Sequence, residues 1–156
     1  MDIAFSEDLV LMEVDAKDKF DLLRQAAKCL QKHGYVKESY ADAVIEREKV
    51  FATGLPTVMG GEEIPHTDVE HVNTHEYCIA RLKNPVDFVI MGDDTETVSV
   101  DCIFMLAMKE AHAQLTLLQN LMGILQDADA LKLVKQGMSA KEICSFVKNR
   151  LSQAAE

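Results

Sequence analysis

The chain has 156 residues, 48% of them hydrophobic, which is enough to bury the core of one ordinary domain. Its 26 acidic and 16 basic residues give a formal net charge of −10, which argues against a nucleic-acid-binding protein built on basic patches. No apolar run reaches the roughly 18 residues that a membrane-spanning helix requires, and the N-terminus lacks a basic, apolar leader. We therefore expect one domain over residues 1–156, located in the cytoplasm, without direct membrane insertion.

A strand and two helices are predicted in the first third of the chain. Residues 9–12 are a short apolar run typical of a strand, and Asp15 is expected to cap a helix that ends at Gly34. A second, amphipathic helix is predicted over residues 38–51. The segment 53–61 contains three glycines and a proline, so it is predicted to be a loop.

The pattern of apolar residues then becomes that of a sheet. Residues 77–82 and 86–91 are short β-branched and apolar runs, separated by Lys83-Asn84-Pro85. Residues 97–108 begin with alternation and end in a continuous apolar run, as a strand buried on both faces does.

Three further helices are predicted toward the C-terminus, over residues 115–125, 128–134 and 139–151. The last of them begins with a capping box formed by Ser139 and Glu142. Because helices and strands alternate along the chain, the predicted fold class is α/β, a single layered domain in which helices cover a sheet.

The four cysteines, Cys29, Cys78, Cys102 and Cys144, are widely spaced and include no Cys-x-x-Cys pair. Their apolar neighbours indicate reduced thiols in the core of a protein from a reducing compartment. None has an evident glycine-rich or basic setting in the sequence, so we expect no cysteine nucleophile.

The segment most informative about function runs from Gly60 to Asp68, where a histidine directly follows a proline at the end of a glycine-rich stretch. Pro65 fixes its own φ and restricts Ile64 to an extended conformation, so the imidazole of His66 is expected to project from a stiff support. Such preorganisation suits a residue that must meet a phosphate or a metal in one orientation. From the residues alone, a loop histidine without a role is an equally good interpretation.

A metal site is a second interpretation of this segment. His66, His71 and His75 lie within ten residues of one another, beside several carboxylates. The segment has no His-Glu-x-x-His pattern, which makes a metal site the weaker interpretation.

The charge pattern favours a transient phosphoryl group. No Lys or Arg occurs between Lys49 and Arg81, while five acidic residues lie close to His66 in the sequence. Repulsion from these carboxylates would raise the energy of a phosphoryl group on His66, which favours handing the group on over keeping it. Stabilisation would come from backbone N–H groups, the Thr67 hydroxyl or a cation from elsewhere in the fold.

Two side chains outside this segment are candidates for that stabilisation. Arg47 lies on the last turn of the second predicted helix, although a solvated charge beside Glu46 or Glu48 is an equally simple interpretation. His112 follows the buried strand at the start of a helix, and sites in open α/β sheets gather at strand ends. On its own, His112 is more simply interpreted as a surface or capping residue.

Five segments together resemble a known family. They are Arg47-Glu48-Lys49, Thr53-Gly54-Leu55-Pro56-Thr57, Ile64-Pro65-His66-Thr67-Asp68, Pro85-Val86-Asp87-Phe88 with Met91-Gly92, and Ile103-Phe104-Met105-Leu106-Ala107 followed by His112. Their order and spacing resemble the IIA component of the phosphoenolpyruvate-dependent sugar phosphotransferase system, of the fructose/mannitol superfamily (EIIA type 2), over nearly the whole chain. The Ile-Pro-His-Thr-Asp form most resembles the galactitol branch.

The resemblance implies a phosphotransferase component in which His66 is the phosphohistidine, carrying the phosphoryl group on Nε2. The donor would be the histidine-containing phosphocarrier protein (HPr), and the acceptor a cysteine of a cognate IIB component, which serves a membrane IIC transporter. Arg47 and His112 would orient or neutralise the phosphate, and neither a metal nor another cofactor is needed. The implied fold is a mixed β-sheet flanked by helices on both sides. The alternative function is that of a nitrogen-type regulatory IIA protein, which acts through its phosphorylation state.

Overall fold

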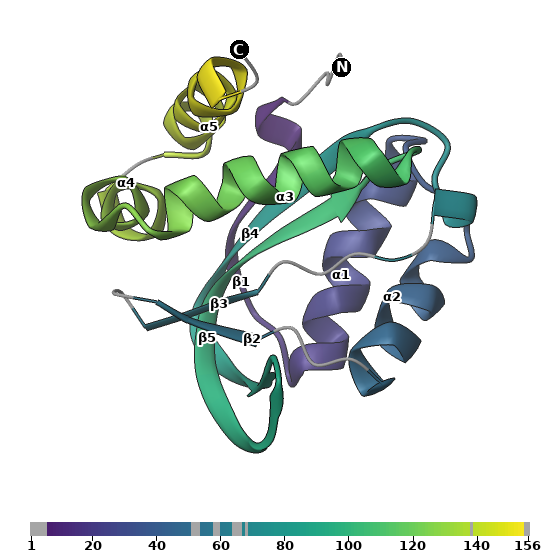
Figure 1. Cartoon of the computed structure of the whole chain (residues 1–156), viewed down its shortest axis with the longest axis horizontal. Coiled ribbons are helices and arrows are strands. Elements are labelled where there is room, and N and C mark those ends of the chain that lie inside the picture. Colours follow the sequence, from purple (N-terminus) through teal and green to yellow (C-terminus); the bar gives the residue numbers. More distant parts are fainter. Residues whose placement is uncertain are drawn as a thin grey trace.

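The computed structural model describes residues 6–50, 54–57, 60–63, 67, 69–137 and 139–154. A mixed five-stranded sheet lies at its centre, in the order β1-β4-β2-β3-β5, with a further pairing between β4 and β5 (Figure 1). Its strands are β1 (Val10–Val14), β2 (Gly54–Thr57), β3 (Gly60–Glu63), β4 (Glu76–Ile90) and β5 (Asp93–Ala107).

The longest strands, β4 and β5, form one antiparallel hairpin of two fifteen-residue arms. The hairpin turns at Gly92, whose φ of +81° costs a glycine little. The register shifts between Arg81 and Val86, where two separate strands were predicted. That prediction was wrong, because the missing N–H of Pro85 is accommodated by an irregularity within a single strand.

The segment predicted as a loop over residues 53–61 instead contains two short strands. β2 and β3 pair antiparallel, with Gly54 opposite Glu63, and β3 also pairs parallel with β5, with Glu63 opposite Ile103. The loop prediction was therefore wrong for residues 54–57 and 60–61. Pairing with β5 supplies backbone partners that outweigh the low strand propensity of glycine and proline.

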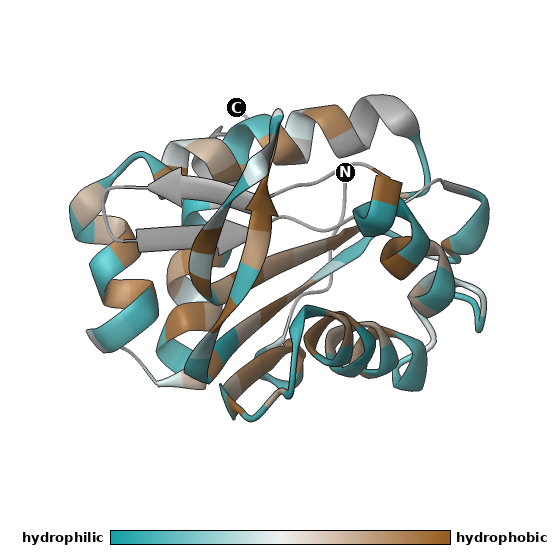
Figure 2. Cartoon of the chain, turned by 90° about the horizontal axis from the view of Figure 1, so that it is seen from below, coloured by the Kyte–Doolittle hydropathy of each residue, from teal (hydrophilic) through white to brown (hydrophobic). Residues whose placement is uncertain are grey.

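The helices are α1 (Lys19–Lys32), α2 (Tyr40–Val50), α3 (Ala111–Leu125), α4 (Ala128–Lys132) and α5 (Ala140–Ala154). Short 3₁₀ turns cover Glu7–Leu9 and Val69–His71, and a π-helical turn covers Leu133–Gly137. In Figures 1 and 2, α1 and α2 cover one face of the sheet, and α3 covers the other. The predicted α/β fold, with helices on both sides of a mixed sheet, is confirmed.

The ends of two helices test the predicted caps. The N-cap of α1 is Asp18, whose carboxylate accepts a hydrogen bond from the Asp21 N–H at 2.8 Å, so the prediction of Asp15 was wrong by one turn. The predicted capping box of α5 is confirmed. The Glu142 N–H donates to Ser139 Oγ at 3.3 Å, and the Ser139 N–H donates to Glu142 Oε1 at 3.2 Å.

The core lies between the helices and the hairpin, where hydrophobic residues line the facing surfaces (Figure 2). The buried Tyr40 hydroxyl donates a hydrogen bond to the Leu106 carbonyl, which ties the start of α2 to the end of β5. Among the described helices, none is long and apolar enough to cross a membrane.

Candidate functional site

His66 lies outside the described residues, as do residues 64, 65 and 68. The elements on either side of this segment are described, and they determine which parts of the fold lie beside it. β3 ends at Glu63, three residues before His66, and three residues of chain reach at most about 11 Å. Glu63 and Thr67 are the described residues on either side of the predicted phosphohistidine in the sequence.

Arg47 lies on α2, and the next described element along the chain, β2, pairs with β3, which ends at Glu63. Arg47 is half-buried in the last turn of α2, and α2 ends at Val50, four residues before Gly54. Four residues of chain reach at most about 14 Å. Gly54 lies directly opposite Glu63, so the first described residue after α2 lies beside the end of β3.

The segment that carries His112 lies at the same end of the sheet. β3 and β5 run parallel, so their C-terminal ends point the same way. β5 ends at Ala107, and α3 begins at Ala111, which makes His112 the second residue of α3. The C-terminal ends of β3 and β5 thus lie at the same end of the sheet, and α3 follows β5 there.

Thr67 is the residue directly after His66, and it is only 5% exposed. Its side chain therefore lies inside the fold.

Two histidines near this end of the sheet have partners of their own. His71 Nδ1 lies 2.8 Å from Ser39 Oγ, and His75 Nδ1 accepts a hydrogen bond from the Lys109 backbone N–H at 2.9 Å. The neutral ring of His75 therefore carries its proton on Nε2. Within the described residues, no group of three His, Cys, Asp or Glu side chains is placed to hold a metal ion.

Lys109 is a cation at this end of the sheet that the sequence reasoning missed. Its Nζ donates to the Val72 carbonyl at 3.0 Å, while its backbone N–H bonds His75. The available signal was its position, since it comes two residues after the long buried strand. Lys109 connects the approach to β4 with the junction between β5 and α3.

A buried carboxyl group, Glu76, begins β4 at the same end of the sheet, opposite Ala107. It is fully buried, and its Oε1 accepts a hydrogen bond from the Tyr77 N–H at 3.0 Å. Burial raises its pKa to about 7, although the hydrogen bond from Tyr77 and the charge of Lys148 act in the opposite direction.

The cysteines depart from the prediction at one position. All four lie in described segments and form no disulfide, and Cys78, Cys102 and Cys144 are buried as predicted. Cys29 is only half-buried, and its pKa is lowered to about 7 by a hydrogen bond from the Cys78 thiol and by the nearby His33 and Lys32. The prediction that no cysteine has a basic setting was therefore wrong for Cys29.

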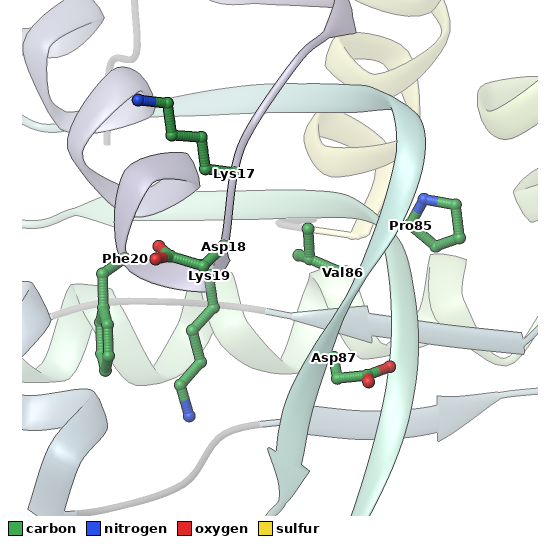
Figure 3. A pocket seen from close by; sticks show the side chains of 7 residues that line it. All are labelled: Lys17, Asp18, Lys19, Phe20, Pro85, Val86 and Asp87. Carbon is green, nitrogen blue, oxygen red and sulfur yellow. The ribbon is translucent and has the colours of Figure 1, made fainter.

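An open cavity of about 440 Å³ lies between the start of α1 and the irregular part of β4. Figure 3 shows its cationic side chains, Lys17 and Lys19, pointing in different directions. The Lys19 ammonium lies 5.2 Å from the centre of the Phe20 ring. Among the described lining residues, the two lysines do not converge on a common point.

Residues 4–150 match the family described as "Phosphoenolpyruvate-dependent sugar phosphotransferase system, EIIA 2". The galactitol-specific EIIA component of Escherichia coli K12 is 29% identical over 115 residues, which cover 74% of this chain and 76% of that protein. The transcriptional regulator ManR of Bacillus subtilis 168 is 32% identical over 133 residues, 82% of this chain. The chain spans only 19% of the length of ManR.

Solved structures show the same fold. The Escherichia coli complex of enzyme IIA for mannitol with its phosphorylated enzyme IIB matches with a TM-score of 0.76 at 21% identity, covering 94% of this chain and 99% of that one. The nitrogen regulatory protein IIA-Ntr of Neisseria meningitidis matches with a TM-score of 0.70 at 21% identity, covering 91% and 94%. With a family match over nearly its whole length, the chain belongs to the EIIA type 2 family of the phosphoenolpyruvate-dependent sugar phosphotransferase system.

Proposed function

We propose that the chain is a single-domain cytoplasmic phosphocarrier that accepts a phosphoryl group on His66 from HPr and passes it to a cysteine of a cognate IIB component. The IIB component would then supply a membrane IIC transporter. The sugar would be of the galactitol type, because a galactitol-specific EIIA component matches over 74% of this chain. The observation that carries the proposal is the strand register, which places Gly54 and Ile103 on either side of Glu63.

In the proposed reaction, His66 attacks phosphorus with the lone pair of Nε2. A new N–P bond forms as the N–P bond to the donor histidine breaks, and the donor imidazole leaves with the electron pair. In the second step, a cysteine thiolate of IIB attacks phosphorus, the S–P bond forms as the N–P bond to His66 breaks, and the His66 imidazole leaves with the electron pair. Such transfers need alignment and charge compensation more than covalent machinery.

Arg47, His112 and Thr67 would supply the charge compensation. A guanidinium binds two phosphate oxygens in a fixed geometry, and an imidazole N–H or a hydroxyl donates to a third. Arg47 would act from the last turn of α2, and His112 from the first turn of α3, where a helix N-terminus also favours an anion. No metal is needed in this scheme.

The partners follow from the charge of the chain and from one relative. A net charge of −10 attracts a partner with a positive docking surface, so the transfer rate should fall as ionic strength rises. A rate independent of salt would contradict this mode of encounter. The mannitol IIA relative was solved in complex with its phosphorylated IIB protein, which supports a IIB partner here.

A second function is favoured by the 32% identity with the regulator ManR. In this alternative, the chain controls another protein through its phosphorylation state and does not feed a transporter. The two functions differ in where the phosphoryl group goes. Chase of the labelled protein with a cognate IIB component should empty it within seconds for a carrier, and should leave it labelled for a regulator.

The test incubates the full chain with phosphoenolpyruvate, enzyme I and HPr, and follows an acid-labile phosphoryl group by intact-mass spectrometry. Wild type and His71→Ala should each gain one phosphoryl group, and His66→Ala should gain none. His71→Ala is the matched control, because it removes a histidine from the same stretch. Full labelling of His66→Ala, or an unmodified wild type with active donors, would refute the proposal.

A further inference from the structure

Lys109 binds one short stretch of the chain, residues 72–75, at two points. Its backbone N–H donates a hydrogen bond to His75 Nδ1 at 2.9 Å, and its Nζ donates one to the Val72 carbonyl at 3.0 Å. The partners lie 34 and 37 residues away from Lys109 in the sequence, so both bonds join distant segments of the fold. Together they close a ring that runs along residues 72–75 and returns through the Lys109 side chain.

The stretch 72–75 is also attached on its other side, to the connection between α1 and α2. The N–H groups of Asn73 and Thr74 both donate to the Tyr35 carbonyl, at 2.9 and 3.1 Å. Val72 is fully buried. The stretch therefore has a fixed place in the fold, and the two bonds described above attach it to the junction between β5 and α3.

His75 bonds Lys109 just beyond the point where β4 and β5 pair. In the described register, Glu76 lies opposite Ala107, which is the first residue of β4 opposite the last residue of β5. His75 precedes β4 by one residue, and Lys109 follows β5 by two. The imidazole thus supplies the acceptor that a backbone carbonyl supplies within a strand pair. It can do so only while Nδ1 carries no proton.

The junction that receives these bonds determines where α3 begins. Residues 108–110 connect β5 to α3, Lys109 is the middle one of the three, and His112 is the second residue of α3. Three residues of chain have little slack, so a displacement of Lys109 is passed on to the first turn of α3. The stretch 72–75, in turn, begins six residues after His66. Lys109 therefore joins the start of α3 to the chain that follows the predicted phosphohistidine.

We propose that His75 and Lys109 are positioning residues for the phosphoryl transfer. They hold the start of α3, and with it His112, at a fixed place relative to the segment that carries His66, and they act through His112 rather than on the phosphoryl group. This inference rests on the proposed function, in which His66 and His112 act together. Positioning matters for such a reaction, because a misplacement of about 1 Å can slow it by about 100-fold.

Two substitutions of His75 test its role as an acceptor. His75→Ala removes the acceptor, whereas Asn Oδ1 in His75→Asn stands the same number of bonds from the backbone as Nδ1 and still accepts the Lys109 N–H. With phosphorylated HPr as donor, the kcat for labelling should fall about fivefold in His75→Ala, as expected for the loss of one hydrogen bond, while the KM for HPr stays unchanged. His75→Asn should restore the wild-type kcat. His33→Ala is the matched control, because it removes an exposed histidine at the end of α1, and it should keep the wild-type kcat.

A third substitution tests the other bond and does not depend on the folding of His75→Ala. Lys109→Met removes the ammonium group and keeps the backbone N–H, so it breaks only the bond to the Val72 carbonyl. Its kcat should also fall about fivefold. Lys141→Met, on the exposed surface of α5, is the matched control and should be as fast as wild type. An unchanged kcat in Lys109→Met, or a kcat in His75→Asn as low as that of a folded His75→Ala, would overturn the proposal.

Amide hydrogen exchange, followed by NMR, checks the hydrogen bond itself without any phosphoryl donor. Exchange of the Lys109 N–H should be about fivefold faster in His75→Ala than in wild type, and His75→Asn should restore the slow rate. A purely structural role would lower the melting temperature of His75→Ala and leave its kcat per folded molecule unchanged, which would also overturn the proposal. If wild type is labelled and the variants keep its kcat, only this inference fails. If wild type takes up no phosphoryl group from active donors, the proposed function fails with it.

Discussion

Replacing Glu76 with glutamine should change how the stability of the protein depends on pH. Glu76 is fully buried, and its pKa rises from 4.5 to about 7 on folding. Between these values the folded state holds a proton that the unfolded state has released. The free energy of unfolding therefore falls as pH rises through this window. Glu76→Gln keeps the acceptor for the Tyr77 N–H and removes the titration.

The size of the effect follows from the shift. A pKa that rises by about 2.5 corresponds to about 3 kcal/mol in total, of which about 2.5 kcal/mol falls between pH 5 and pH 8. Urea unfolding followed by circular dichroism at both pH values gives the free energy of unfolding of each protein. The free energy of unfolding of Glu76→Gln minus that of wild type should therefore be about 2.5 kcal/mol larger at pH 8 than at pH 5.

Replacing the carboxyl group with an amide can also change the free energy of unfolding by an amount that does not depend on pH. This amount cancels when the values at pH 5 and pH 8 are compared. Glu96→Gln is the matched control, because Glu96 is exposed on β5, and its difference from wild type should be the same at both pH values. If Glu76→Gln also differs from wild type by a constant amount, burial does not hold the Glu76 proton, and the reasoning fails.

Three further predictions concern the proposed site and the packing around it. Arg47→Ala and His112→Ala should each slow the labelling of His66 by about 10- to 100-fold, because each would remove a charge-assisted hydrogen bond to the phosphoryl group. Neither substitution should lower the melting temperature. Unchanged labelling rates would assign both residues a structural role only. Lys135 Nζ lies 2.6 Å from Asp101 Oδ1, and its side chain is 2% exposed against 44% for Asp101. Asp101→Asn, which removes one carboxylate beside the buried ammonium, should cost more in urea unfolding than Lys135→Met, which removes the buried charge itself, and equal costs would contradict this. Ser139→Ala should cost about 1 kcal/mol in the same assay by removing half of the capping box, and no loss would show that the cap is dispensable.

The parts of the fold that depend on local sequence were predictable. The capping box of α5 needs only Ser139 and the residue three positions later, and it formed as predicted. The strands β2 and β3 were not predictable from their composition, because their partner β5 begins thirty residues after β3 ends. Long-range pairing with β5 decided their structure, because it outweighs the low strand propensity of the glycines that indicated a loop.

The same distinction applies to the sites. The resemblance to EIIA proteins indicated Arg47, His66 and His112, and these assignments stay predictions that the labelling experiments test. The basic setting of Cys29 was overlooked, although Lys32 and His33 follow it at helical spacing.

The pairing of β1 has a consequence for biosynthesis. In the part of the chain that the structure describes, β1 pairs with β4 alone, and Val10 lies opposite Ile79, 69 residues later. A ribosome that adds 5–20 residues per second needs about 3–14 s to make the intervening stretch. During that interval the apolar face of α1 has no sheet to pack against, so the nascent N-terminal third is the part of the molecule most in need of a chaperone.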